Sequence, residues 1–202
     1  LCLWPGDPGR WRAMTTEPTS KSVVWGSWAI AFFLAHLVWH AFLGDPENSL
    51  WACHVASLLI GIGGIAASPT CVFVGLLWLV VGIPLWFYHL AVGGPLVPTS
   101  LLTHFGGATV GCVLLCKFMS VSKSASAWWQ ASSGLIALVA LTRLVTAREA
   151  NINLAFDIHG KNDTTMDEHV RYLLAIAAVV AVVFFLSEII LRRVLFKSCD
   201  TS

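Results

Sequence analysis

The chain has 202 residues, of which 57% are hydrophobic and 11% are charged, and its formal net charge is +1. A soluble globular domain carries about 45–50% apolar and about 25% charged residues, so this composition excludes an ordinary soluble domain. It also lacks the basic stripe that nucleic-acid binding requires. The expected fold class is an all-α, polytopic integral membrane helix bundle, with membrane lipids and no nucleic acid as partners.

Six apolar segments come close to the length of about 20 residues that a membrane-spanning helix needs. In chain order they are residues 23–43, 50–67, 71–92, 101–119, 128–145 and 170–191. We therefore predict one membrane domain of six transmembrane helices, at 23–192, between a polar N-terminal tail (1–22) and a short C-terminal tail (193–202). Residues 1–13 precede Met14 and are interpreted as an upstream extension or as non-native residues. They hold no apolar stretch, so no cleavable signal peptide is expected.

Polar turns separate these segments, and small residues lie within some of them. A polar turn at 44–49 follows the first segment, and Asn48 or Ser49 is expected to cap the second helix. The second segment contains Gly61, Gly63 and Gly64, small residues that allow helices to approach closely. The long polar connection is at 147–168, and its stretch 148–157 alternates polar and apolar residues. Three placements of that stretch are compatible with this pattern: along the membrane surface, folded over the histidine site described below, or in an ordinary surface loop.

The basic residues predict the orientation, because Lys and Arg are enriched on the cytoplasmic side. With the N-terminus inside, eight of the twelve basic residues face the cytoplasm: Arg10, Arg12, Lys21, Lys117, Lys123, Arg192, Arg193 and Lys197. Both termini are therefore expected in the cytoplasm. The short loops fit a multi-pass protein of a bacterial inner membrane.

This topology places all seven histidines of the chain at or beyond the outer leaflet. Five of them belong to four successive predicted helices: His36, His40, His54, His89 and His104. The other two, His159 and His169, lie in or next to the last outer loop and are expected to be solvated. Because ionisable residues inside a membrane are usually functional, the five form a candidate site.

Imidazoles at one depth, with few carboxylates nearby, are suited to zinc, copper or iron. A single haem is the alternative cofactor, because two facing histidines can ligate its iron. We expect His40, His54, His89 and His104 to be the principal metal ligands, with His36 as a fifth ligand or a supporting residue. The six cysteines form no C-x-x-C pair and predict no disulfide framework.

Arg143 lies one turn inside the outer end of the fifth predicted helix. A guanidinium at this depth snorkels to the interface, or it pairs with an anionic substrate, a lipid phosphate or a haem propionate. Arg143 is therefore a second candidate, as an anion or propionate partner.

The functional hypothesis from sequence is an integral membrane metalloprotein with a His-rich site in the outer leaflet. It would be an enzyme or a redox subunit that acts on a lipid or another apolar substrate, and the sequence leaves open whether it is an enzyme. One alternative is a non-catalytic subunit that binds a pigment, haem or metal in a complex with another membrane protein or a second copy. Another alternative is a small-molecule or ion transporter.

Overall fold

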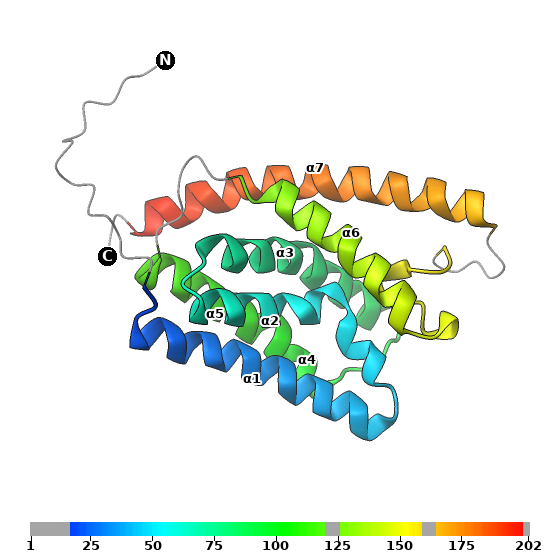
Figure 1. The fold of residues 1–202 in the computed structure, drawn as a ribbon, viewed down its shortest axis with the longest axis horizontal. Coiled ribbons are helices and arrows are strands. Elements are labelled where there is room, and N and C mark those ends of the chain that lie inside the picture. Colours follow the sequence, from blue (N-terminus) through cyan, green and yellow to red (C-terminus); the bar gives the residue numbers. More distant parts are fainter. Residues whose placement is uncertain (1–16, 120–125, 159–164, 200–202) are drawn as a thin grey trace, which may run out of the picture.

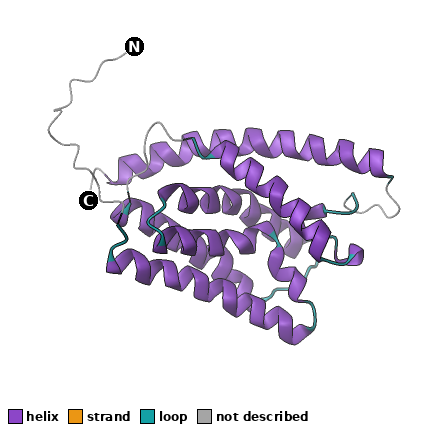
Figure 2. Ribbon diagram, in the orientation of Figure 1, coloured by secondary structure: helices purple, strands orange, loops and turns teal. Residues whose placement is uncertain are grey.

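The computed structural model describes residues 17–119, 126–158 and 165–199. These residues form helices and loops and contain no strand (Figure 2), which confirms the all-α class. The N-terminal extension, Lys123 and His159 are among the predictions that lie outside the described residues.

The helices agree closely with the predicted segments. They are α1 (Ser20–Leu43), η2 (Pro46–Leu50), α2 (Ala52–Ile65), α3 (Pro69–Ala91), α4 (Pro98–Leu101), η3 (Leu102–Gly106), α5 (Gly107–Val113), η4 (Leu114–Phe118), α6 (Trp128–Val145), η5 (Arg148–Ala150), η6 (Ile152–Leu154) and α7 (Met166–Cys199). The clearest difference is α7, which extends the sixth predicted segment at both ends.

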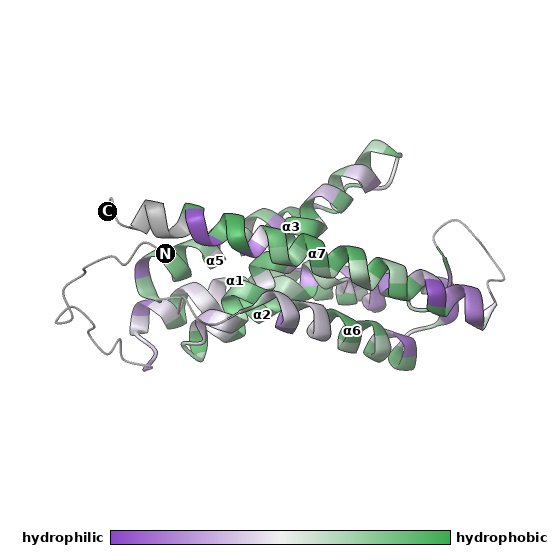
Figure 3. Cartoon of the chain, turned by 90° about the horizontal axis from the view of Figure 1, so that it is seen from above, coloured by the Kyte–Doolittle hydropathy of each residue, from purple (hydrophilic) through white to green (hydrophobic). Residues whose placement is uncertain are grey.

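Among the residues that the structure describes, four stretches of helix are long and apolar enough to cross a membrane: Ser20–Leu43, Pro69–Ala91, Pro98–Phe118 and Met166–Val194. Along α7, hydrophobic residues cover the middle and hydrophilic residues gather at both ends (Figure 3). The apolar helix α2 has only 14 residues, and α6 carries Gln130 and Arg143 among its apolar residues. The six-span count and the orientation of the termini stay predictions.

Helix α2 packs chiefly against α1 and α3 (Figure 1). Glycines make the contact with α1 close: a Cβ atom at Gly26 would lie 2.7 Å from the Gly61 carbonyl oxygen, and one at Gly64 would lie 2.8 Å from the Gly26 Cα. The small residues of the second predicted segment therefore serve the helix contact that the sequence indicated.

The bundle has two ends with different chemistry. At one end, α1 finishes, α2 begins, and α6 connects to α7 (Figure 1). Toward the other end of α7, Glu188 accepts hydrogen bonds from the backbone N–H groups of Ala127 (3.0 Å) and Trp128 (2.7 Å), which precede and begin α6. Glu188 also pairs with Arg192 at 2.7 Å. A carboxylate at a helix N-terminus is favourably placed in the helix dipole, so Glu188 fastens α6 to α7.

Two local features of the helices differ from expectation. Asn48 and Ser49 do not cap α2; they lie in the 3₁₀ turn η2, and α2 starts at Ala52 with no capping hydrogen bond from its N-cap residue Trp51. The fourth predicted helix is also irregular, because η3 and η4 are π-helical. Single π turns interrupt α-helices often at functional sites, and η3 carries His104.

Candidate metal centre

Four of the five predicted ligands form a row of imidazoles at the end of the bundle where α1 finishes and α2 begins. Ring centroids are 4.6 Å apart between His40 and His36, 3.9 Å between His36 and His54, and 5.3 Å between His54 and His104. The indole of Trp86 stacks on His104, with centroids 5.2 Å apart. Three helical elements, α1, α2 and η3, thus bring side chains that are 68 residues apart in sequence into one buried cluster.

One ring nitrogen of His104 has no hydrogen-bond partner in the described part of the chain. Its Nδ1–H donates to the Ser100 carbonyl oxygen at 2.7 Å, because a carbonyl oxygen can only accept. In the neutral ring, Nε2 therefore carries the lone pair. The side chain is fully buried, and Nε2 has no hydrogen-bond partner among the described residues. Buried polar atoms are rarely left unpaired, so this nitrogen is the strongest candidate for a metal-binding atom.

The hydrogen-bond network assigns a similar tautomer to His54. Its Nδ1 lies 3.2 Å from the Asn48 carbonyl oxygen and 3.0 Å from His36 Nε2. Nδ1–H is therefore the donor, and Nε2 of the neutral ring carries the lone pair. Metal-bound histidines commonly donate their second ring N–H to a carbonyl oxygen, which fixes the orientation of the ring. His54 and His104 both show this pattern.

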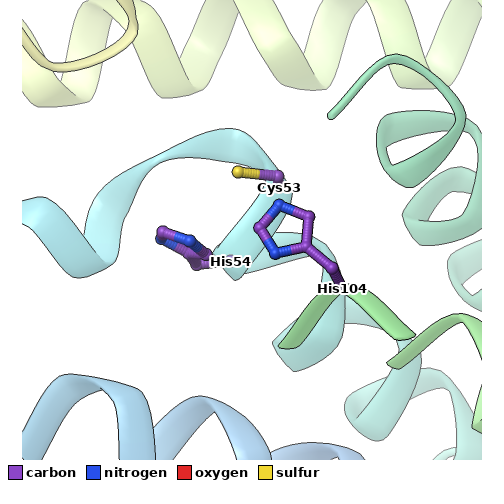
Figure 4. Close-up of side chains that lie close together, drawn as sticks. All are labelled: Cys53, His54 and His104. Atoms are coloured by element: carbon purple, nitrogen blue, oxygen red, sulfur yellow. The ribbon is translucent and has the colours of Figure 1, made fainter. Parts of the chain in front are cut away.

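Cys53 completes a group that the histidines alone do not form. One ligand atom each from Cys53, His54 and His104 lies within 4.8 Å of the other two, and the three residues come from α2 and η3 (Figure 4). A tetrahedral zinc ion with bonds of about 2.0–2.3 Å holds its ligand atoms about 3.3–3.8 Å apart. The separations between the three ligand atoms would therefore have to shorten by about 1 Å to match this geometry, and rotation of the side chains can cover this distance. The group could therefore hold a metal ion.

His36 and His40 surround this group without joining it. His36 is fully buried, accepts from His54 through Nε2 and donates to Thr99 Oγ1 at 2.8 Å through Nδ1. His40 Nδ1 donates to Asp45 Oδ1 at 2.9 Å. This hydrogen bond lowers the pKa of Asp45, a residue of the loop after α1, below its ordinary value. His36 and His40 thus hydrogen-bond to groups next to the Cys53, His54 and His104 cluster, and whether either binds a metal ion stays a prediction.

The remaining candidates lie elsewhere. His89 has an exposed side chain near the end of α3, where its ring lies against Gly94, so the structure does not bring it into the cluster. His169 is buried rather than solvated and donates from Nε2 to the Leu154 carbonyl oxygen at 3.0 Å. Arg143 Nη1 donates to the Ala155 carbonyl oxygen at 2.6 Å. The guanidinium is thus half-buried against the connection between α6 and α7.

Sequence reasoning missed Cys53. The sequence feature that could have indicated Cys53 as a ligand is its position immediately before the predicted ligand His54 at the start of a helix. The spacing of side chains along a regular helix, however, argues against two adjacent residues binding the same metal ion. Adjacent helical residues point about 100° apart, so two neighbours rarely face the same point. Here Cys53 and His54 lie in the first turn of α2, and His104 lies within reach of both.

Comparisons with known proteins give no relative: no family model, no curated protein and no solved structure matches the chain.

Proposed function

We propose that the chain is an integral membrane metalloprotein that binds one transition-metal ion through Cys53, His54 and His104. The observation that carries the proposal is the convergence of three ligand atoms within 4.8 Å, one of them on a ring whose buried Nε2 has no partner among the described residues. Four helices of membrane-spanning length support the membrane location. In this proposal six segments cross the membrane, both termini are cytoplasmic, and the site lies near the outer face.

The ligand set favours zinc or copper. One thiolate and two imidazoles are softer ligands than the oxygens that magnesium and calcium require. Zinc accepts mixed Cys and His ligands and keeps an open position in its catalytic sites, while a trigonal set of two His and one Cys is typical of copper in electron transfer. Iron is the third candidate. The haem alternative has less support, because the imidazoles contact one another and a porphyrin would need a flat gap between them.

Three protein ligands leave a fourth position for water, a substrate or a further ligand. An open position on a metal ion is the feature that metal-dependent enzymes use to activate water or to polarise a substrate. In a membrane helix bundle, this supports an enzyme or redox subunit that acts on a lipid or another apolar molecule. A metal-binding subunit of a larger complex uses the same ligands but has no turnover of its own.

Metal analysis of the purified full chain tests the proposal. We expect about one zinc or copper ion per chain after loading and dialysis, and a loss of most of this metal in His104→Ala and Cys53→Ala. The matched control is His89→Ala, which removes a predicted ligand that lies outside the cluster and is expected to keep the metal. A wild-type chain that binds no zinc, copper or iron, or ligand variants that bind as tightly as the wild type, would contradict the proposal. An absorption spectrum of the same sample tests for haem.

A further inference from the structure

The segment between α6 and α7, residues 148–157, is held from one side by three side chains of these helices. Thr142 Oγ1 donates to the Ile152 carbonyl oxygen at 3.3 Å, His169 Nε2 donates to the Leu154 carbonyl oxygen at 3.0 Å, and Arg143 Nη1 donates to the Ala155 carbonyl oxygen at 2.6 Å. Ile152 and Ala155 are fully buried. The segment therefore packs against α6 and α7.

On its other side, the segment reaches the start of α2 through one side chain. Asn153 Oδ1 accepts from the Ala52 backbone N–H at 2.9 Å, and Asn153 Nδ2 donates to the Leu50 carbonyl oxygen at 2.9 Å. The first N–H groups of a helix have no partner within the helix, and α2 receives no capping bond from its own N-cap residue. Asn153 supplies this bond from a position 101 residues away.

The backbone conformation at Asn153 is also unusual. Its φ is +56° and that of Leu154 is +59°, so two successive non-glycine residues adopt the left-handed conformation. Asparagine tolerates this conformation better than most residues, whereas leucine does not. Such a conformation persists only where the surroundings fix it, and it is found often at functional sites. Here the contacts from α6 and α7 on one side and from α2 on the other fix it.

The residues next to the Asn153 contacts are the proposed ligands. Ala52 directly precedes Cys53 and His54, and both ligands lie in the helical turn whose first N–H is bound by Asn153. We propose that Asn153 is a positioning residue of the metal centre, which holds the first turn of α2 so that Cys53 and His54 face His104. This inference rests on the proposed function, since it assumes that these three residues bind a metal ion.

Cobalt(II) titration of the full chain in detergent tests the inference, because cobalt replaces zinc and its visible absorption reports ligand geometry. The main variant is Asn153→Gly, which removes both side-chain hydrogen bonds while glycine accepts the positive φ without strain. We expect cobalt affinity to fall by about 10–100-fold, the usual effect of removing a group that orients a metal ligand, together with a changed visible spectrum. Asn153→Asp keeps an acceptor for the Ala52 N–H and is expected to restore part of the affinity and the spectrum.

The control is Trp78→Phe, which removes a buried hydrogen bond from Trp78 Nε1 to the Ala131 carbonyl oxygen, between α3 and α6. It is expected to lower stability without changing the cobalt spectrum. Wild-type affinity and spectrum in both Asn153 variants would overturn the inference and leave the metal site standing. A weaker affinity with an unchanged spectrum, matched by Trp78→Phe, would also overturn it by showing general destabilisation. Failure of the wild type to bind cobalt, zinc, copper or iron refutes the proposed function itself.

Discussion

Replacing His104 by leucine tests whether His104 binds metal. If it does, we expect the variant to be at least as stable as the wild type without metal and less stable than the wild type with metal. The substitution keeps a similar volume and removes both ring nitrogens. It relieves the buried, unpartnered Nε2, whose desolvation costs about 1–3 kcal/mol. It also loses the hydrogen bond from Nδ1 to the Ser100 carbonyl oxygen, worth about 0.5–1.5 kcal/mol. That carbonyl still accepts from Thr103 Oγ1 at 3.0 Å, so no new unpaired group is created.

The difference between these two effects is about −0.5 to +2.5 kcal/mol in favour of the metal-free variant, so the variant should be as stable as the wild type or more stable. Metal reverses the order, since a ligand that binds only the folded state at 100 times its Kd stabilises that state by about 2.7 kcal/mol. Only the wild type is expected to gain this amount.

Thermal unfolding of the detergent-solubilised chain, first with a chelator and then with zinc or copper, measures both differences. His89→Leu serves as the control, because its side chain is exposed and outside the cluster; it should respond to metal as the wild type does. The reasoning is refuted if the metal-free wild type is clearly more stable than His104→Leu, or if both gain equally from metal.

Three further substitutions test the surroundings of the site and the fold. His36→Phe keeps an aromatic side chain but removes the acceptor of the His54 N–H. Metal affinity should fall by about 10–100-fold in a titration, and an unchanged affinity would contradict the supporting role. The His40 hydrogen bond lowers the pKa of Asp45, so this bond stabilises the fold above the ordinary pKa of 3.8, and the stabilisation is lost as the pH falls through the lower pKa of the folded state. The stability difference between wild type and Asp45→Asn should therefore shrink below pH 3.8 in acid unfolding curves. A constant difference would exclude the His40–Asp45 pair as its source. Glu188→Ala leaves buried partners without their carboxylate and should lower the free energy of unfolding by about 3–5 kcal/mol, whereas a loss below 1 kcal/mol in denaturant unfolding would show that the contact is weak.

Hydropathy and residue spacing predicted where the long helical segments lie along the chain. The boundaries of α1, α3 and α6 lie within three residues of the predicted segments, because an apolar run between polar turns depends on the local sequence alone. The same local information placed His36, His40, His54 and His104 toward one end of the bundle, where the structure finds them in a row. The number of spans and the side of the membrane are still predictions from the sequence.

Which side chains meet depends on the packing of the helices and not on the local sequence. Depth along a helix does not determine the direction in which a side chain points, and that direction depends on how each helix is rotated and packed. His89 lies at the expected end of α3 but is exposed, whereas the π turn η3 carries His104 with its Nε2 unpartnered. Cys53 and His54 form one group because His104, from another helical element, lies within reach of both, and Asn153 reaches the first turn of α2 from 101 residues away. No local pattern encodes such a contact, because the packing of distant helices creates it.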